Sequence, residues 1–234
     1  MTRYPETIMN PTLETTRDIT QAAPRTSIAR PIPRPDAYVR TSGFDLLYLV
    51  DWMAALALAV LSLPTLTLAV IWVLIVDWGN PFFVQTRVGL NGEPYRMFKI
   101  RSMYRDHHGR AKFCAHGDSR IIPGGRILRN YRIDEIPQFL NVLLGDMALV
   151  GPRPEQVPFV ATFLGEIPDY GKRFMVKPGI TGLAQTTQGY VDSLEGTRIK
   201  LKYDLEFIDK RSFRCWLGIV LKTVEMVVFK VGAR

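Results

Sequence analysis

The pattern of apolar positions divides the chain into three unequal parts. Residues 1–43 are rich in Pro, Thr and Arg and show no lasting apolar period, which predicts a disordered or loosely attached arm. Residues 44–77 are almost uniformly apolar, which predicts a membrane helix. Residues 78–234 combine short strand-like and helix-like patterns with turn residues. We therefore expect a mixed α+β domain after the apolar stretch.

The apolar stretch from Leu46 to Val76 contains one charge, Asp51, and one proline, Pro64. A continuous helix of this length measures roughly 45 Å, enough to cross a hydrocarbon core of about 30 Å. Pro64 removes a hydrogen bond near the middle and forces a kink, and Ser62 is placed to satisfy a freed carbonyl. Two interpretations stand: a single kinked transmembrane helix, or a re-entrant hairpin that enters and leaves on the same side.

Positive residues flank this stretch on both sides, and such residues favour the cytoplasmic side of a membrane. Their distribution leans towards re-entry, although the residues alone leave both interpretations open. The flanking cations are Arg25, Arg30, Arg34 and Arg40 before the stretch, and Arg87, Arg96, Lys99 and Arg101 after it.

In the domain, the turn Asn91-Gly92 predicts a hairpin between strands at Phe82–Val84 and Tyr95–Ile100. Apolar periodicity predicts helices over Gly125–Arg132 and from Glu135 to Leu144. The second helix is expected to end at Gly145 and to carry on one face Phe139, Leu140, Leu143 and Leu144. 

The last apolar stretch, Phe213 to Phe229, contains charges such as Arg214 and Lys222 and is more polar than a spanning helix. It is expected either to lie in the membrane interface or to pack on the domain.

Charge narrows the range of partners. The net charge of +8 suits anionic partners, which include nucleic acid, lipid headgroups and phosphorylated substrates. Nucleic-acid binding would need aromatic and basic residues interleaved on one face and has no use for some thirty apolar residues. We therefore expect no nucleic-acid partner.

The segment around Asp134 and Glu135 is the most suggestive site. Pro137 belongs in a first helical turn, so both carboxylates are expected at a helix N-terminus, where bound phosphates are also favoured. Arg129 and Arg132 add positive charge one turn upstream. In the alternative interpretation Asp134 is only an N-cap and Glu135 only a favourable first-turn charge.

Three further segments have the chemistry of phosphate sites. Arg153 lies between Pro152 and Pro154, which fix its backbone, and a fixed arginine is a good bidentate phosphate ligand. The glycines between Lys177 and Gln185 allow backbone amides to approach an anion. Lys99 and Arg101 share one strand face. The alternatives are a rigid surface turn, a structural loop and a solvated strand face.

Together and in this order, these motifs resemble the bacterial sugar transferases, the monotopic phosphoglycosyl transferases that start glycan assembly on a polyprenyl phosphate. The resemblance runs from about Phe44 to Val231. The matching segments are Gln85–Arg87 with Gly89, Phe98–Met103, Asp118–Arg120, Ile133–Gln138, Asn141–Met147, Val150–Pro154, Pro178–Gly182 with Gln185, and Tyr203-Asp204.

The resemblance implies a fold and a location. It implies a re-entrant membrane helix kinked through Ser62 and Pro64, followed by a cytoplasmic α/β catalytic domain with interfacial amphipathic helices. The implied location is the cytoplasmic face of the bacterial inner membrane, in contact with membrane lipid, and a homodimer is compatible with this layout. One departure is Trp216, which stands where family members often carry an acidic residue.

The resemblance also implies a two-step reaction in exopolysaccharide or related glycan assembly. Asp134 attacks a UDP-sugar, releases UMP and forms a phosphosugar-enzyme, from which undecaprenyl phosphate takes the sugar phosphate. Glu135 is expected to hold Mg²⁺. The residues expected to bind substrate are Arg129, Arg153, Lys99, Arg101, Asp118, Arg120 and Gln185. A catalytically silent membrane scaffold is the competing hypothesis, but it has no chemical need for Asp134, Glu135 and Arg153.

Overall fold

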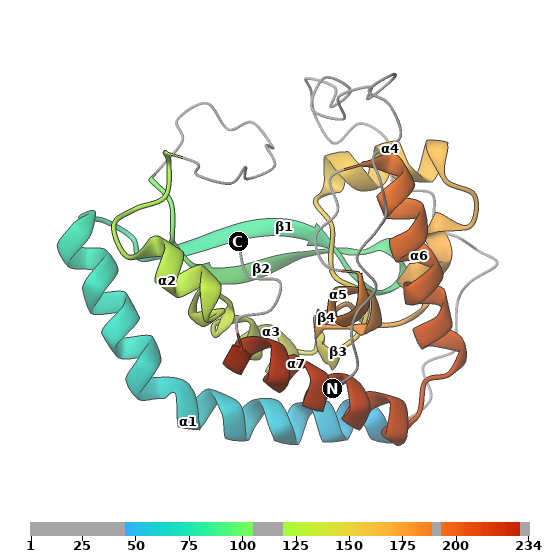
Figure 1. The fold of residues 1–234 in the computed structure, drawn as a ribbon, viewed down its shortest axis with the longest axis horizontal. Coiled ribbons are helices and arrows are strands. Elements are labelled where there is room, and N and C mark those ends of the chain that lie inside the picture. The colour runs from blue at the N-terminus through green and yellow to red at the C-terminus, as the bar shows by residue number, and fades with distance from the viewer. Residues whose placement is uncertain (1–44, 105–118, 189–192, 230–234) are drawn as a thin grey trace, which may run out of the picture.

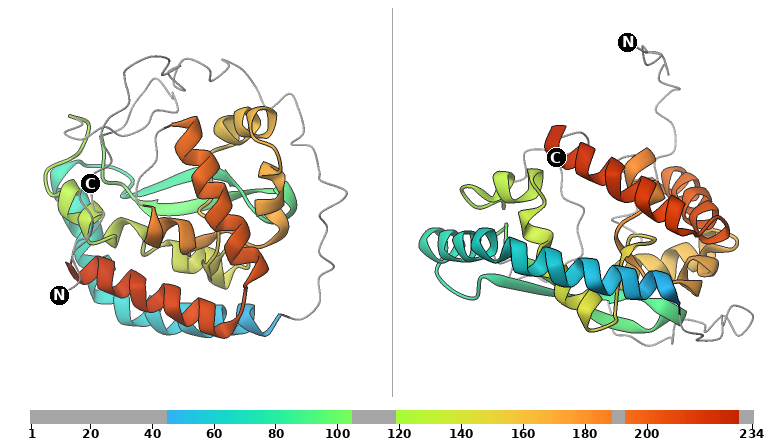
Figure 2. Two further views of the ribbon diagram at one scale, coloured as in Figure 1. Left: turned by 45° about the vertical axis from the view of Figure 1, so that its right-hand side comes forward. Right: turned by 90° about the horizontal axis from the view of Figure 1, so that it is seen from below.

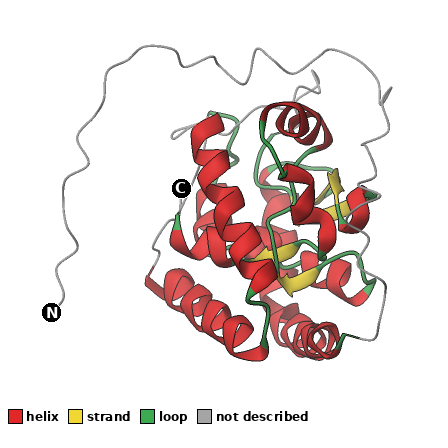
Figure 3. Cartoon of the chain, turned by 90° about the vertical axis from the view of Figure 1, so that its right-hand side faces the viewer, coloured by secondary structure: helices red, strands yellow, loops and turns green. Residues whose placement is uncertain are grey.

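The computed structural model describes residues 45–104, 119–188 and 193–229. The arm expected over residues 1–43 and the candidate ligand Asp118 lie outside these residues. The described part is a mixed helix-and-strand structure, as the sequence predicts, in which short strands lie among helices (Figure 3). Its helices and strands are α1 (Leu46–Val76), β1 (Phe82–Val88), η1 (Leu90–Gly92), β2 (Pro94–Ile100), α2 (Gly125–Asn130), η2 (Ile133–Glu135), α3 (Gln138–Leu143), β3 (Ala148–Val150), α4 (Val157–Glu166), η3 (Tyr170–Met175), β4 (Gly179–Thr181), α5 (Leu183–Thr187), α6 (Leu194–Asp209) and α7 (Phe213–Phe229).

Helix α1 begins where the Asp45 carboxylate accepts a hydrogen bond from the N–H of Leu47 at 3.0 Å. It runs for 31 residues with Pro64 inside it, and its ribbon changes direction partway along (Figure 1). Pro64 has no N–H to offer the carbonyl four residues earlier, and the Ser62 hydroxyl donates to the adjacent carbonyl of Ala59 at 3.1 Å. Of the described helices, α1 is long and apolar enough to cross a membrane.

Both halves of α1 contact the rest of the chain. In the first half, the Trp52 indole N–H donates to the carbonyl of Leu143, at the end of α3, at 3.2 Å. In the second half, the Trp72 indole N–H donates to the carbonyl of Pro123, just before α2, at 2.9 Å. Helix α7 lies alongside the first half (Figure 2). Ion pairs hold both ends of α1.

The ion pair at the start of α1 joins its N-cap, Asp45, to Arg211 in the connection between α6 and α7. At the other end, Asp77 caps the helix and pairs with Arg101, directly after β2, at 2.6 Å. The two ends of α1 are therefore attached to the same folded domain.

Strands β1 and β2 form the predicted antiparallel hairpin, paired from Phe82 with Ile100 to Val88 with Pro94. The turn residues Asn91 and Gly92 both have positive φ, 55° and 78°, which confirms the turn signal. A second, two-stranded sheet joins β3 and β4 in parallel. Arg153 lies just after β3 in the chain and the glycine Gly179 begins β4, and the sequence analysis did not predict this sheet.

The helix predicted from Glu135 to Leu144 is shorter in the structure. It begins as the turn η2, and α3 covers only Gln138–Leu143 before Gly145, with φ 87°, ends it. Two of the four apolar residues expected on one face are exposed, Leu140 at 49% and Leu144 at 62%. Polar Asn141 is buried instead: it accepts from the N–H of Phe98 at 3.0 Å and donates to the carbonyl of Arg96 at 2.7 Å. Satisfied hydrogen bonds to β2 explain why the polar face turns inward.

Candidate active site

Asp134 and Glu135 lie in η2, between α2 and α3, and both are buried at 9% and 6% exposure. The chain enters this turn through Arg132 in the left-handed conformation, with φ 54°, which is uncommon for a residue with a side chain. The cap of α3 is Pro137, and no side chain caps either η2 or α3. The interpretation of Asp134 as a simple N-cap is therefore wrong.

Glu135 is the centre of a group of cations. Its Oε1 accepts from Lys99 Nζ at 2.9 Å and from Arg153 Nη2 at 2.8 Å, while Oε2 lies 3.5 Å from Arg132 Nη1. Burial alone would raise the pKa of Glu135, but the charges of Arg153, Lys99 and Arg132 outweigh it and hold the pKa well below its ordinary value. Glu135 is therefore an ionised carboxylate at neutral pH.

Asp134, its neighbour, has a different environment. Burial raises the pKa of Asp134 to about 6; Lys99 opposes this rise, and the adjacent Glu135 adds to it. Arg129 and Arg153 favour the charged form as well. A buried carboxylate with few hydrogen bonds is a better nucleophile than a solvated one, because less solvent must be removed before it reacts. The environment thus raises the pKa of Asp134 and lowers that of the adjacent Glu135.

The structure brings only part of the predicted set together. Lys99 and Arg153 contact Glu135 directly, and the charge of Arg129 acts on Asp134. Arg129 also donates to the sulfur of Met103 at 3.5 Å. These three cations and the two acids form the group that we call the η2 cluster: Lys99, Arg129, Arg153, Asp134 and Glu135.

The remaining predicted residues lie elsewhere. Arg101 does not bind Glu135 as Lys99 does, because both of its terminal nitrogens donate to Asp77 at the end of α1. The side-chain amide of Gln185 donates to the carbonyl of Ile180 at 2.9 Å. Arg120 precedes the bridge between Met103 and Ile121, and its carbonyl accepts from the N–H of Tyr104. A substrate contact for Arg101, Gln185 or Arg120 stays a prediction.

The donor set of the η2 cluster fits a magnesium ion. Mg²⁺ is commonly held by one or two carboxylates and completes its shell with substrate phosphates and water. Asp134 and Glu135 supply two carboxylates, and Glu135 Oε2 has only the long contact with Arg132. Over the described ranges, no group of three or more Asp, Glu, His or Cys side chains is placed to hold a metal. A site of this kind would therefore rely on the substrate for its other ligands.

The sequence analysis assigned no role in the site to three charged side chains near Arg153. Arg87, Arg173 and Asp204 lie behind Arg153, where Arg173 and Arg87 donate to the carbonyls of Arg153 and Pro154. Arg87 and Asp204 belong to matching segments, but nothing in the sequence assigned them a role. Arg173 was missed because two of its partners, the Arg153 carbonyl and the Asp204 carboxylate, lie 20 and 31 positions away in the chain.

Comparison with known proteins places this sequence in one family. The sequence profile of the bacterial sugar transferases matches residues 46–230. The chain belongs to that family.

Individual relatives agree with this assignment. The chain is 41% identical to the UDP-N-acetylgalactosamine-undecaprenyl-phosphate N-acetylgalactosaminephosphotransferase of Aeromonas hydrophila, over 79% of this chain and 44% of that protein. It is 38% identical to the UDP-glucose:undecaprenyl-phosphate glucose-1-phosphate transferase of Caulobacter vibrioides, over 83% of this chain and 72% of that protein. The transferase of the same name from Escherichia coli K12 is 38% identical over 76% of this chain and 38% of its own length. The chain thus spans less than half of two of these relatives.

Proposed function

We propose that this chain is a phosphoglycosyl transferase that moves a sugar-1-phosphate from a UDP-sugar to undecaprenyl phosphate. The observation that carries the proposal is the buried Asp134, which lies next to Glu135 and the two cations, Lys99 and Arg153, that Glu135 binds. The names of the three relatives support this substrate class, since each acts on a UDP-sugar and undecaprenyl phosphate. They differ in the sugar, so the donor is proposed only as a UDP-linked hexose or N-acetylhexosamine.

In the proposed first step, a carboxylate oxygen of Asp134 attacks the phosphorus atom that carries the sugar. A bond forms between that oxygen and phosphorus, the pyrophosphate bond breaks, and UMP leaves with the bond's electron pair. Lys99, Arg129 and Arg153 offset the negative charge of the phosphates, which would otherwise repel the carboxylate. Mg²⁺ held by Glu135, with Asp134 nearby, would supply further screening of phosphate charge.

In the proposed second step, a phosphate oxygen of undecaprenyl phosphate attacks the same phosphorus. The bond to Asp134 breaks, the carboxylate is regenerated, and the product is a polyprenyl-diphosphate sugar. Because the acceptor's phosphate sits at the membrane surface while its tail stays in lipid, the η2 cluster must lie at headgroup depth.

The attachment of α1 supports a re-entrant arrangement in the membrane. A straight spanning helix would place its ends on opposite faces, whereas Asp45 and Asp77 are both paired with residues of one domain. We propose that α1 enters and leaves the bilayer on the cytoplasmic side of the bacterial inner membrane, with the bend at Ser62 and Pro64 at its deepest point. Arginines on both flanks agree with this orientation.

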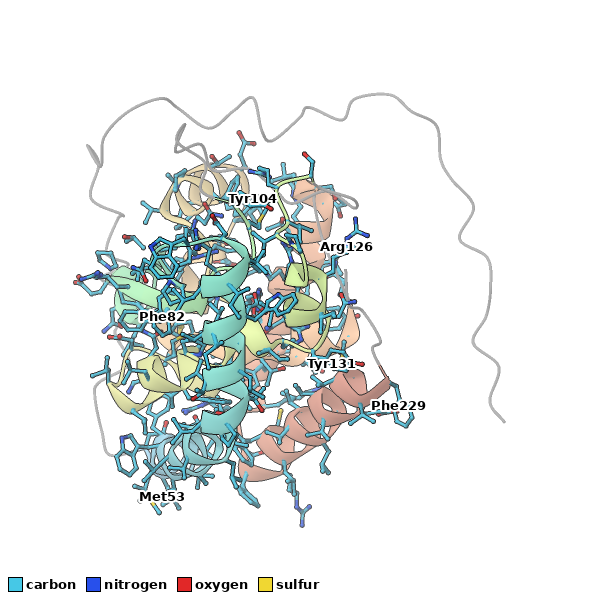
Figure 4. All side chains as sticks on the ribbon, turned by 90° about the vertical axis from the view of Figure 1, so that its left-hand side faces the viewer. Met53, Phe82, Tyr104, Arg126, Tyr131 and Phe229 are labelled. Carbon is cyan, nitrogen blue, oxygen red and sulfur yellow. The ribbon has the colours of Figure 1, made fainter. Side chains whose placement is uncertain are left out.

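Exposed apolar side chains support membrane contact beyond α1. Met53 of α1 and Phe229 of α7 both point outward in Figure 4, and both are more than half exposed. The outward face of α3 contributes Leu140 and Leu144. We propose that α3 and α7 lie in the interface, because so much contiguous apolar surface is rarely left in water.

The test is UMP release by the full chain in nanodiscs containing undecaprenyl phosphate, with Mg²⁺ and a panel of UDP-sugars. Asp134→Asn is expected to abolish release, while Asp209→Asn, which alters an exposed carboxylate on α6, is expected to leave it unchanged. With donor labelled in the sugar-linked phosphate and no acceptor present, label should bind covalently to the unmodified chain and not to Asp134→Asn. Release by Asp134→Asn at the unmodified rate would contradict the proposal.

A further inference from the structure

The backbone that carries Arg153 is held at four successive carbonyls, Pro152–Glu155. Each accepts a hydrogen bond, and the donors come from three separate parts of the chain. In the order of the acceptors, the donors are the Gly179 N–H at 2.9 Å, Arg173 Nη2 at 2.7 Å, Arg87 Nη1 at 3.1 Å and the Val88 N–H at 3.2 Å. Two of the four donors are charged side chains, which form stronger hydrogen bonds than neutral ones.

Arg173 is the more deeply buried of the two charged donors, with its side chain 2% exposed. Its Nη1 donates to the Tyr170 hydroxyl at 2.6 Å, and its Nη2 lies 2.9 Å from the Asp204 carboxylate, which is 3% exposed. Arg173 comes from η3 and Asp204 from α6, so this pair connects two elements behind the Arg153 loop.

A buried ion pair is weak evidence of a contribution to stability, because desolvation offsets much of its attraction. Apolar side chains of similar volume would fill the same space. What an apolar pair does not supply is a directed donor to the carbonyl of Arg153. The direction of Arg173 Nη2 therefore suggests a role in geometry.

The geometry in question is that of the Arg153 guanidinium. Its backbone carbonyl accepts a hydrogen bond from Arg173, while its side chain donates to Glu135 at 2.8 Å. Glu135 is fixed in turn by Lys99. A shift of the Arg153 backbone would be passed directly to the cation that faces the phosphates, and a misplacement of about 1 Å can lower a reaction rate by two orders of magnitude.

We propose that Arg173, oriented by Asp204, is a positioning residue that sets the place of Arg153 in the η2 cluster. Arg173 itself touches no substrate, and it acts only through Arg153. This inference rests on the proposed function, in which Arg153 contacts the phosphates of the nucleotide-sugar.

The test is a double-mutant cycle on the full chain in nanodiscs, with UMP release as the readout. Arg173→Gln is expected to lower kcat/KM about tenfold or more in the unmodified chain. In the Arg153→Ala background, the same change is expected to alter kcat/KM less than about twofold, because the residue through which it acts is gone. An equal loss in both backgrounds would overturn the proposal.

Two further variants separate positioning from folding. Asp204→Asn should reproduce the loss of Arg173→Gln, whereas Asp209→Asn, on the same helix but exposed, should not. The double variant Arg173→Met with Asp204→Leu replaces the ion pair by apolar groups, which often preserves stability. It should melt near the unmodified chain and still lose about tenfold in kcat/KM. A rate equal to that of the unmodified chain in this double variant would overturn the proposal.

The same cycle read out by UDP binding in calorimetry does not depend on turnover. Coupling between Arg173 and Arg153 in UDP affinity would support the positioning role even without UMP release. The absence of UMP release would count only against the transferase reaction. If the effects of Arg173→Gln and Arg153→Ala on UDP affinity simply add, the positioning role would be overturned. UMP release by the unmodified chain would in that case still support the transferase reaction.

Discussion

Trp216 of α7 donates its indole N–H to the carboxylate of Asp51 in α1 at 2.7 Å, and both side chains are buried. Asp51 is the only charged residue within α1, so this bond gives the one carboxylate of the apolar helix a hydrogen-bond donor. Tryptophan supplies a donor, and it also stacks on Phe213 at 5.8 Å.

Loss of this donor should loosen α7 from α1. Trp216→Phe keeps an aromatic ring but leaves a buried carboxylate oxygen without its partner, which costs about 1.5–3 kcal/mol for a bond to a charged group. We expect a lower melting temperature of the detergent-solubilised chain. Trp52→Phe, which removes a half-exposed indole bond from the same helix, should cost less. An equal fall in melting temperature in the two variants would mean that the Trp216 bond contributes no more to stability than the Trp52 bond.

The planar fork of Arg153 should matter beyond its charge. Arg153→Lys keeps one positive charge but loses the geometry that binds a phosphate with two hydrogen bonds, so we expect kcat/KM for the UDP-sugar to fall roughly tenfold. The matched control is Arg198→Lys on α6, where the arginine is exposed and far along the chain from the cluster. A rate unchanged by Arg153→Lys would indicate that only charge is required there.

Pro64 should determine on which side of the membrane α1 ends. Pro64→Ala restores a helix hydrogen bond and permits a straight helix, which is incompatible with ion pairs at both Asp45 and Asp77. We expect a fraction of the variant to present an N-terminal tag on the face opposite the domain, as measured by protease accessibility in sealed vesicles. Pro158→Ala, in the exposed first turn of α4, is the control. A tag that stays on the domain side in every molecule would contradict this role.

Acid should weaken the support behind Arg153. Burial alone would raise the pKa of Glu155, but Lys200, Arg173 and Arg87 lower it to about 2 from its ordinary 4.5. A depressed pKa contributes stability that is present above pH 4.5 and is lost as pH falls towards 2. The loss amounts to about 3 kcal/mol. The raised pKa of Asp204, caused by its burial, acts in the opposite direction.

Denaturant titration of the unmodified chain and of Glu155→Gln between pH 6 and 3 measures this contribution. The difference between the two stabilities should shrink as the pH falls below about 4.5, because the unfolded chain then binds a proton at Glu155 while the folded chain does not. A constant difference across this range would show that the charge of Glu155 contributes nothing.

The sequence predicted those features that depend on neighbours in the chain. The apolar length and Pro64 predicted α1, the Asn91-Gly92 turn predicted the hairpin, and the Phe213 stretch predicted α7. Asp134 was chosen as a candidate because two acids and two nearby arginines stand together in the sequence.

Features that depend on distant partners were missed. The parallel pairing of β3 with β4 joins segments of three residues each, too short for a recognisable strand pattern. The orientation of α3 was not predicted, because the apolar pattern does not show that Leu140 and Leu144 are exposed, whereas Asn141 is buried by its hydrogen bonds to β2. Arg173 was missed for the same reason. An arginine is expected at the surface unless its buried partner, here Asp204, is known.

The attachment of both ends of α1 to one domain has a consequence for bilayer thickness. A spanning helix must match its apolar length to the full hydrocarbon depth, and a mismatch is met by tilting or by deforming the lipid. A helix that turns back at Pro64 need only match one leaflet, because no part of it anchors in the opposite headgroups. Such a chain would be nearly indifferent to acyl-chain length, and would work as well on a lipid monolayer as on a bilayer.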